Sequence, residues 1–292
     1  MKCGYLLLVL TFFLWGSLYV VSKYAFAAIP PLTVLLLRYV LALPVLGLLA
    51  WHKGMKAIEK RHLPYFLLCG ALGYALAIGL QLMANERMDA SLASLLNATN
   101  PVFISLFAVL LLKERMNRYK VAGIVCSLLG VAAVLGLSGG ESSTVGVLLC
   151  VGAVLFWSLH SVVVRKISAD YSTEQLTFCC IAAAVPFCLA ASLIELQSRS
   201  LAFTPSSLGA VVYIAVMCTA VANLSWNRAL AMVDASVCSL FYPLQPLSSA
   251  LLGVLFLGEP ITVNFVLGAV LISAGVVIGL REPKEKTPLS SG

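Results

Sequence analysis

Ten runs of about 20 mostly apolar residues, separated by short polar segments, limit what this chain can fold into. The runs cover residues 4–26, 33–51, 63–84, 91–112, 119–138, 145–165, 173–194, 206–227, 235–257 and 262–281. With 61% hydrophobic and only 11% charged residues, the chain has more apolar side chain than a soluble domain could bury. The sequence therefore predicts an all-α membrane protein with ten transmembrane helices.

Lysine and arginine are unevenly distributed between the segments that connect these runs. With the N-terminus inside, the inner segments hold fifteen of them and the outer segments hold two, Arg87 and Arg199. Cytoplasmic loops carry such an excess, so both termini are predicted to be cytoplasmic. The net charge of +7 reflects this bias and does not indicate a nucleic-acid partner. The polar residues 282–292 are predicted to form a disordered cytoplasmic tail.

The chain also contains an internal repeat, which constrains its topology further. Shifted by 145 positions, residues 89–131 align with residues 234–276, with 16 of 43 positions identical. Five spans per copy is an odd number, so the second copy would cross the membrane upside down relative to the first. We therefore predict a 5+5 inverted-topology repeat, with one five-helix unit over residues 1–140 and the other over residues 141–281.

Polar side chains inside the runs mark candidate substrate contacts, because polar groups are costly in hydrocarbon. We interpret them as lining a central cavity, with helix–helix hydrogen bonding as the alternative. The candidates are Trp15, Tyr19, Arg38, Tyr74, Gln81, Asn97, Asn100, Trp157, His160, Asn223, Asn227, Tyr242 and Gln245. Pro101 and Pro246 remove a backbone donor and are predicted hinges; static kinks are the alternative.

The distribution of charge narrows the class of substrate. All twelve acidic residues fall in the connecting segments or at the ends of runs. A proton-coupled exporter of cationic drugs would need a carboxylate deeper in the membrane, so neutral, zwitterionic or anionic cargo is favoured. Arg38 could bind a carboxylate or phosphate as a two-pronged donor, or could bond to helix-end carbonyls. Lys23 could extend to the outer surface or assist Arg38 with a phosphate.

Three motifs resemble those of the EamA family of the drug/metabolite transporter superfamily. They are Leu14-Trp15-Gly16-Ser17, Leu37-Arg38-Tyr39 and a proline-to-glutamate segment that occurs twice, from Asn100-Pro101 to Glu114 and from Gln245-Pro246 to Glu259. The resemblance covers residues 4–281. It implies a ten-helix exporter or carrier of small metabolites with a central cavity, and it leaves the substrate undefined.

Together these features predict a secondary transporter in the plasma (inner) membrane of a bacterium, working by alternating access through a central cavity. Amino acids or related carboxylates are the favoured substrates, and phosphorylated metabolites or nucleotide sugars are the alternative. A membrane enzyme would need a nucleophile with a base or a metal cluster, and a sensor would need a soluble domain. We therefore predict no catalytic residue, metal or cofactor. The Gly275/Gly279 motif is expected to pack helices and could also serve a homodimer.

Overall fold

The computed structural model describes residues 2–113, 117–136, 144–165, 167, 170–230, 232 and 241–279. Within these ranges every regular element is helical, which confirms the predicted all-α class. The helices are α1 (Lys2–Phe26), α2 (Pro31–His52), η1 (Lys60–His62), α3 (Leu63–Cys69), η2 (Gly70–Ala77), α4 (Ile78–Arg87), α5 (Ala90–Asn97), α6 (Asn100–Leu112), α7 (Arg118–Gly136), α8 (Thr144–Arg165), α9 (Thr173–Glu195), α10 (Pro205–Tyr213), η3 (Ile214–Val221), α11 (Ala222–Leu230), α13 (Leu244–Leu257) and α14 (Val263–Gly279).

Seven helical segments in the described part of the chain are long and apolar enough to cross a membrane. They run over Cys3–Phe26, Pro31–His52, Lys60–Arg87, Ala90–Leu111, Thr144–Val164, Thr173–Glu195 and Pro205–Trp226, and α13 and α14 are shorter apolar helices. Many large apolar side chains on the outside remain uncovered; Leu6, Ile194 and Val263, for example, are 69%, 67% and 72% exposed. Such a surface fits a hydrocarbon environment.

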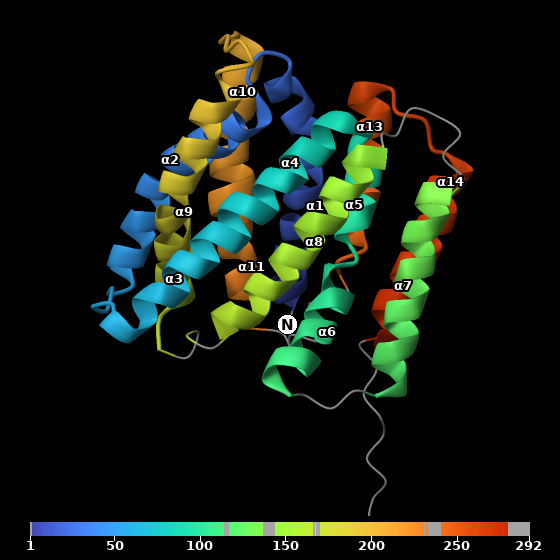
Figure 1. The fold of residues 1–292 in the computed structure, drawn as a ribbon, viewed down its shortest axis with the longest axis horizontal. Helices are drawn as coiled ribbons and strands as arrows, with labels where there is room; N and C mark the ends of the chain where they lie inside the picture. Colours follow the sequence, from blue (N-terminus) through green and yellow to red (C-terminus); the bar gives the residue numbers. More distant parts are fainter. Residues whose placement is uncertain are drawn as a thin grey trace, which may run out of the picture.

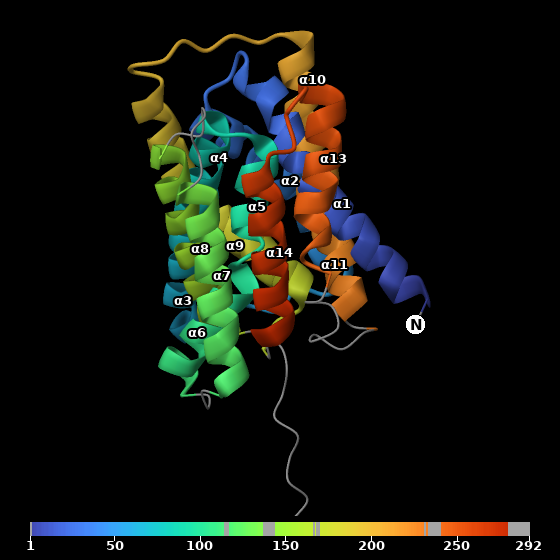
Figure 2. The same cartoon turned by 90° about the vertical axis from the view of Figure 1, so that its right-hand side faces the viewer.

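The helices form a bundle with a pair at each edge (Figure 1). Helices α2 and α9 pack together at one edge, and α7 and α14 pack together at the opposite edge. Helix α1 lies between them and contacts α11 and α13. Figure 2 shows α14 running down to the end of the bundle where α6 ends and α7 begins. The ribbon begins near the same end.

Two π-helical segments interrupt otherwise α-helical rods. They are η2, between α3 and α4, and η3, between α10 and α11. Each is eight residues long, and their first residues, Gly70 and Ile214, are 144 positions apart. This is almost the offset at which the sequence repeats. Wide turns of this kind are rare and often occur at functional sites, so the two copies share a local irregularity that apolar periodicity does not reveal.

Close backbone approach fixes the pair of helices at the second edge. A Cβ atom placed on Gly123 of α7 would lie 2.7 Å from the carbonyl oxygen of Gly275 and 2.7 Å from the Cα of Gly279, both in α14. Only hydrogen fits there, as expected where helices meet through small residues. The Gly275/Gly279 face is therefore used within the chain, and the helix-packing role predicted for it agrees with this contact.

The predicted continuous helix over residues 91–112 is divided into two. Helix α5 ends at Asn97 and α6 begins at Asn100, with a turn at residues 98–99. Proline at position 101 cannot donate a backbone hydrogen bond and clashes with the preceding turn, which explains why the helix is broken here.

Candidate functional site

Three of the predicted contact residues meet at one hydroxyl group in the interior. The Tyr19 hydroxyl accepts a hydrogen bond from Gln81 Nε2 at 2.8 Å and another from Gln245 Nε2 at 3.3 Å. The three residues come from α1, α4 and α13, and they are 1%, 8% and 8% exposed. Side chains from three distant parts of the sequence thus form one buried polar cluster, which we call the Tyr19 cluster.

Arg38 of α2 is buried and reaches across to η3. Its Nε and Nη2 both donate to the Thr219 hydroxyl, at 3.1 and 2.9 Å. Thr219 in turn donates to the carbonyl of Ile214, five residues earlier, at 3.0 Å. That spacing belongs to the π-helical turn. The wide turn therefore helps to aim the threonine hydroxyl at the guanidinium group.

The guanidinium of Arg38 lacks an anionic partner in the part of the chain that the structure describes. The ion pairs found there are Arg61–Glu59, His62–Asp170, Arg87–Glu86 and Arg199–Glu86. Arg38 is only 6% exposed, and its Nη1 is buried without a hydrogen-bond partner. Its Cζ lies 5.5 Å from the centroid of the Tyr39 ring. A buried cation with an unused donor is unfavourable until an anion joins it.

A second polar group surrounds the break between α5 and α6. Asn100 Nδ2 donates to the Asn97 carbonyl at 2.8 Å, the carbonyl that Pro101 leaves without its helical donor. Asn97 Nδ2 donates to the Ala93 carbonyl at 3.2 Å and contacts the Cys150 sulfur at 3.3 Å. The asparagine side chains thus donate hydrogen bonds to backbone carbonyls at the break between the helices. A break bonded in this way corresponds to a static kink, which was the alternative to the predicted hinge.

Pro246 occupies a different position from Pro101. It lies in the first turn of α13, which begins at Leu244, where a missing backbone donor disturbs the helix little. The Tyr242 carbonyl, four residues before Pro246, accepts the backbone N–H of Gln245 at 3.1 Å. Residues 235–240, the first part of the predicted ninth run, lie outside the described residues.

The predicted aromatic contacts separate into two groups. Trp15 packs with Trp226 at a centroid distance of 5.7 Å, and Phe12 packs against Tyr242 at 4.9 Å. Phe12 also contacts both tryptophans, so α1, α11 and the residues before α13 share one group.

The other aromatic group joins η2 to α8. Tyr74 meets Trp157 at 5.7 Å and His160 at 5.2 Å. A Cβ atom on Gly73 would lie 2.3 Å from the ring of His160, so a larger residue there would displace the imidazole. His160 Nδ1 is buried without a hydrogen-bond partner. Trp15 and Trp157 thus pack into separate groups.

The remaining predicted contacts lie on α11. Asn223 Nδ2 donates to the carbonyl of Thr219, one turn earlier, and so sits beside the residue that receives Arg38. Asn227 belongs to the same helix, but its side chain lies outside the described residues. Among the residues that are described, no three His, Cys, Asp or Glu side chains gather as metal ligands would.

Comparison with known proteins identifies the family. The model of the EamA-like transporter family matches the chain twice, over residues 2–136 and 144–281. The chain belongs to the EamA-like transporter family. This confirms the resemblance inferred from the sequence motifs, and an EamA protein with seven or more apolar helices is an integral membrane protein.

Several relatives of this EamA protein cover almost its whole length. An uncharacterized transporter of Archaeoglobus fulgidus is 25% identical over 94% of this chain and 96% of its own. A probable terminal-alkyne amino-acid exporter of Streptantibioticus cattleyicolor is 26% identical over 93% and 91%. A probable amino-acid metabolite efflux pump of Salmonella typhimurium is 27% identical over 96% and 95%. One crystal structure shares the fold, with a TM-score of 0.66 at 22% identity over 95% of this chain and 96% of the other.

Two carboxylates stabilise helix N-termini at the same end of the EamA bundle. Glu195, the last residue of α9, accepts the backbone N–H groups of Leu32 and Thr33 at the start of α2, at 3.2 and 3.0 Å. Glu259, just beyond α13, accepts the N–H groups of Ala90 and Ser91 at the start of α5. Both carboxylates bind donors that a helix cannot satisfy itself.

Sequence reasoning missed Asn85 and Thr219. Asn85 is 1% exposed, and its Nδ2 donates to the Tyr19 backbone carbonyl at 2.8 Å. It follows Gln81 by four residues and therefore shares its helix face, but the predicted run ended at residue 84. The signal in the sequence that could have identified Thr219 is its position four residues before Asn223, a predicted contact. Threonine is common in apolar helices, so its role appears only once Arg38 is placed beside it.

Proposed function

We propose that this EamA protein is a secondary transporter of amino acids or related carboxylates, working by alternating access between two halves. The halves are residues 1–140 and 141–281, each contributing five membrane-spanning helices of opposite orientation, with both termini in the cytoplasm. The predicted cytoplasmic tail, residues 282–292, lies outside the described residues. Inverted repeats of this kind place the substrate near the middle of the membrane, between the halves.

The repeat is supported by three independent observations. The family model matches once on each side of residues 137–143. The π-helical segments η2 and η3 occur at corresponding places in the two copies. The contact of Gly123 with Gly275 supports it too, because the two glycines come from the last long helix of each matched region.

The observation that carries the substrate assignment is the unpaired guanidinium of Arg38. It is buried, it uses two of its donors on one hydroxyl, and its Nη1 has no partner. A carboxylate would bind this fork through parallel charge-assisted hydrogen bonds. The buried Tyr19 cluster offers amide and hydroxyl groups to the rest of a polar substrate. The names of the Streptantibioticus and Salmonella relatives point to the same class.

A phosphate-bearing substrate is less well supported, because Lys23 is engaged elsewhere. Its Nζ donates to the carbonyl of Met88, just before α5, at 2.7 Å. Arg38 is then left without the second cation that we had considered for a phosphate. The other residues predicted to contact substrate around this centre are Trp15, Tyr74, Asn97, Asn100, Trp157, His160, Asn223, Asn227, Tyr242 and Gln245. Pro101 and Pro246 remain predicted hinges.

Transport in proteoliposomes tests the proposal. Arg38→Ala should abolish uptake of labelled amino acids across a broad panel, and Arg38→Lys should restore part of it, since lysine supplies the charge without the fork. Arg199→Ala is the matched control, because this arginine pairs with Glu86 in an exposed position. Unchanged uptake by a correctly folded Arg38→Ala protein would reject the assigned role.

The topology has a separate test. Single cysteines at Lys113 and Gly258, which occupy matching places in the two copies, should react with a membrane-impermeant thiol reagent from opposite sides of intact cells. Labelling of both from the same side would exclude an inverted repeat.

A further inference from the structure

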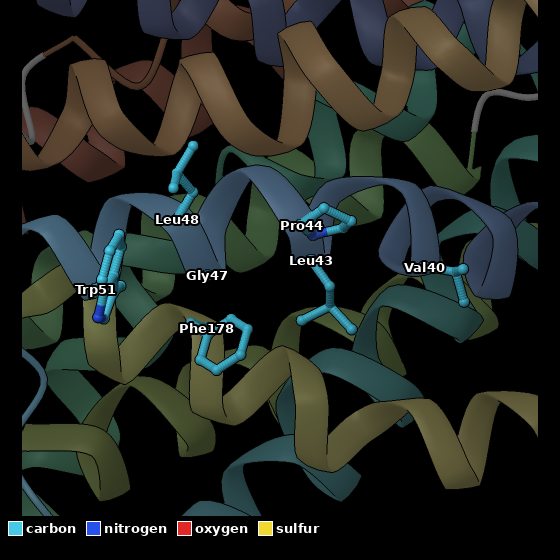
Figure 3. A pocket seen from close by; sticks show the side chains of 7 residues that line it. All are labelled: Val40, Leu43, Pro44, Gly47, Leu48, Trp51 and Phe178. Carbon is cyan, nitrogen blue, oxygen red and sulfur yellow. The ribbon is translucent and has the colours of Figure 1, made fainter.

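A groove of 630 Å³ lies on the outside of the bundle between α2 and α9, away from the buried polar residues. It is lined by Val40, Leu43, Pro44, Gly47, Leu48, Trp51 and Phe178. Figure 3 shows Val40 and Trp51 at opposite ends of the groove and the Phe178 ring of α9 beside Gly47. Val40, Leu48 and Trp51 are 47%, 54% and 69% exposed, so this surface faces the surroundings of the protein.

The length of the groove matches one leaflet of a bilayer. From Val40 to Trp51 the helix rises about 16 Å, at 1.5 Å per residue. Half of the hydrocarbon core is about 15 Å thick. Trp51 lies at one end of this length, and tryptophan is enriched where hydrocarbon meets the head groups. The groove therefore fits one acyl chain that enters beside Trp51.

A basic loop is held in place beside the Trp51 end. The Gln175 side chain of α9 accepts the backbone N–H of Lys56 at 3.0 Å and donates to its carbonyl at 2.6 Å. Gln175 lies one turn before Phe178, which lines the groove. The Tyr171 hydroxyl also accepts the backbone N–H of Glu59 at 3.1 Å. The loop is thus fixed against the start of α9.

This loop gives the mouth of the groove a positive charge. Residues 53–61 include Lys53, Lys56, Lys60 and Arg61 but a single acid, Glu59, which pairs with Arg61 at 2.6 Å. Lys53 and Lys56 are exposed, and Lys56 Nζ donates to the backbone carbonyl of Asp170 at 3.2 Å. Juxtamembrane cations attract anionic head groups.

We propose that this groove is a specific site for an anionic phospholipid. One acyl chain lies along α2 from Trp51 to Val40, and the phosphate binds near Lys53 and Lys56. The inference rests on the proposed topology, which places this loop on the cytoplasmic side, where anionic lipids are attracted to positive loops. Lipid binding in detergent does not depend on how the protein is oriented in a membrane. If the lipid does not bind, the transport proposal is therefore unaffected.

Native mass spectrometry of the full chain tests the site, with phosphatidylglycerol and phosphatidylcholine of identical acyl chains as probes. We expect one phosphatidylglycerol to be retained per chain and phosphatidylcholine to be lost. The double variant Lys53→Gln/Lys56→Gln should weaken phosphatidylglycerol retention about tenfold or more. Arg228→Gln, an exposed cation on α11, should leave it unchanged.

The groove itself has a matched pair of variants. Val40→Trp should fill the end of the groove farthest from Trp51 and reduce retention of phosphatidylglycerol. Val45→Trp adds the same side chain to the same helix, at an exposed position outside the groove. Each variant must elute as the wild type on size exclusion. Equal retention of the two lipids by the wild type, or equal behaviour of the two tryptophan variants, would overturn the proposal.

Discussion

The Glu259 carboxylate binds the first turn of α5 through Ser91: Oε2 accepts the Ser91 hydroxyl at 2.8 Å and the Ser91 backbone N–H at 3.1 Å. Oε1 accepts the backbone N–H of Ala90 at 2.7 Å. Glu259 and Ser91 lie in different regions matched by the family model. One charged side chain therefore links the two copies at a helix N-terminus.

Replacing Glu259 by glutamine should weaken this link. The amide keeps one acceptor but loses the negative charge that favours a helix N-terminus, so we expect a loss of about 1–2 kcal/mol. The measurement is the thermal unfolding midpoint in detergent. Glu59→Gln serves as control, because Glu59 pairs with Arg61 in an exposed position where such pairs contribute little. Equal midpoints for Glu259→Gln and the wild type would contradict the prediction.

Removing the hydroxyl of Thr219 should impair substrate binding while the fold persists. Thr219→Val deletes the acceptor of two Arg38 hydrogen bonds, so the guanidinium loses its fixed direction. We expect KM for a carboxylate substrate to rise about tenfold, the worth of one charge-assisted hydrogen bond of about 1.5 kcal/mol. Thr11→Val is the control, since that buried hydroxyl donates to the backbone carbonyls of Leu7 and Ala222 rather than accepting from Arg38. A KM equal to that of the control would count against the role of Arg38.

Tyr19→Phe should destabilise the interior more than Tyr39→Phe. The first change removes an acceptor shared by Gln81 and Gln245, so two buried amides lose a partner, at a cost of about 1–3 kcal/mol each if left unsatisfied. The second removes only the donor to the Tyr74 carbonyl. The unfolding midpoints of the two variants provide the comparison. A smaller loss for Tyr19→Phe than for Tyr39→Phe would show that Gln81 and Gln245 do not depend on the Tyr19 hydroxyl.

The contact between α7 and α14 predicts opposite effects for two glycine substitutions. Gly123→Ala should lower the unfolding midpoint, because the new methyl group would lie 2.7 Å from backbone atoms of α14. Gly209→Ala, in α10, meets no atom within 4 Å and should raise stability by about 0.5–1 kcal/mol through the better helix propensity of alanine. If both substitutions acted alike, the helices would not approach as closely as described.

Apolar periodicity and length were enough to predict the helical class and most of the helix positions. The predicted runs 33–51 and 173–194 differ from α2 and α9 by at most two residues at either end. The irregular features of the helices were not predicted, because hydropathy does not change across them. The π-helical turns at Gly70 and Ile214 lie in strongly apolar segments, and the break after Asn97 became visible only as a proline nearby.

The candidate site was harder to predict than the helices. Polarity within the membrane identified Tyr19, Gln81 and Gln245, and the structure brings these three together. It could not identify which residues touch, because that depends on how helices from distant parts of the sequence pack. For the same reason Thr219 was not foreseen as the partner of Arg38.

The unpaired guanidinium of Arg38 has a kinetic consequence for the proposed cycle. Reorienting the empty protein would take an uncompensated cation through a low-dielectric interior, whereas the loaded protein would carry a neutral ion pair. We therefore expect counterflow: labelled substrate should enter liposomes faster when unlabelled substrate is present inside. If the proposed role of Arg38 holds, the protein would work as an exchanger that binds a second carboxylate before it returns to its starting conformation.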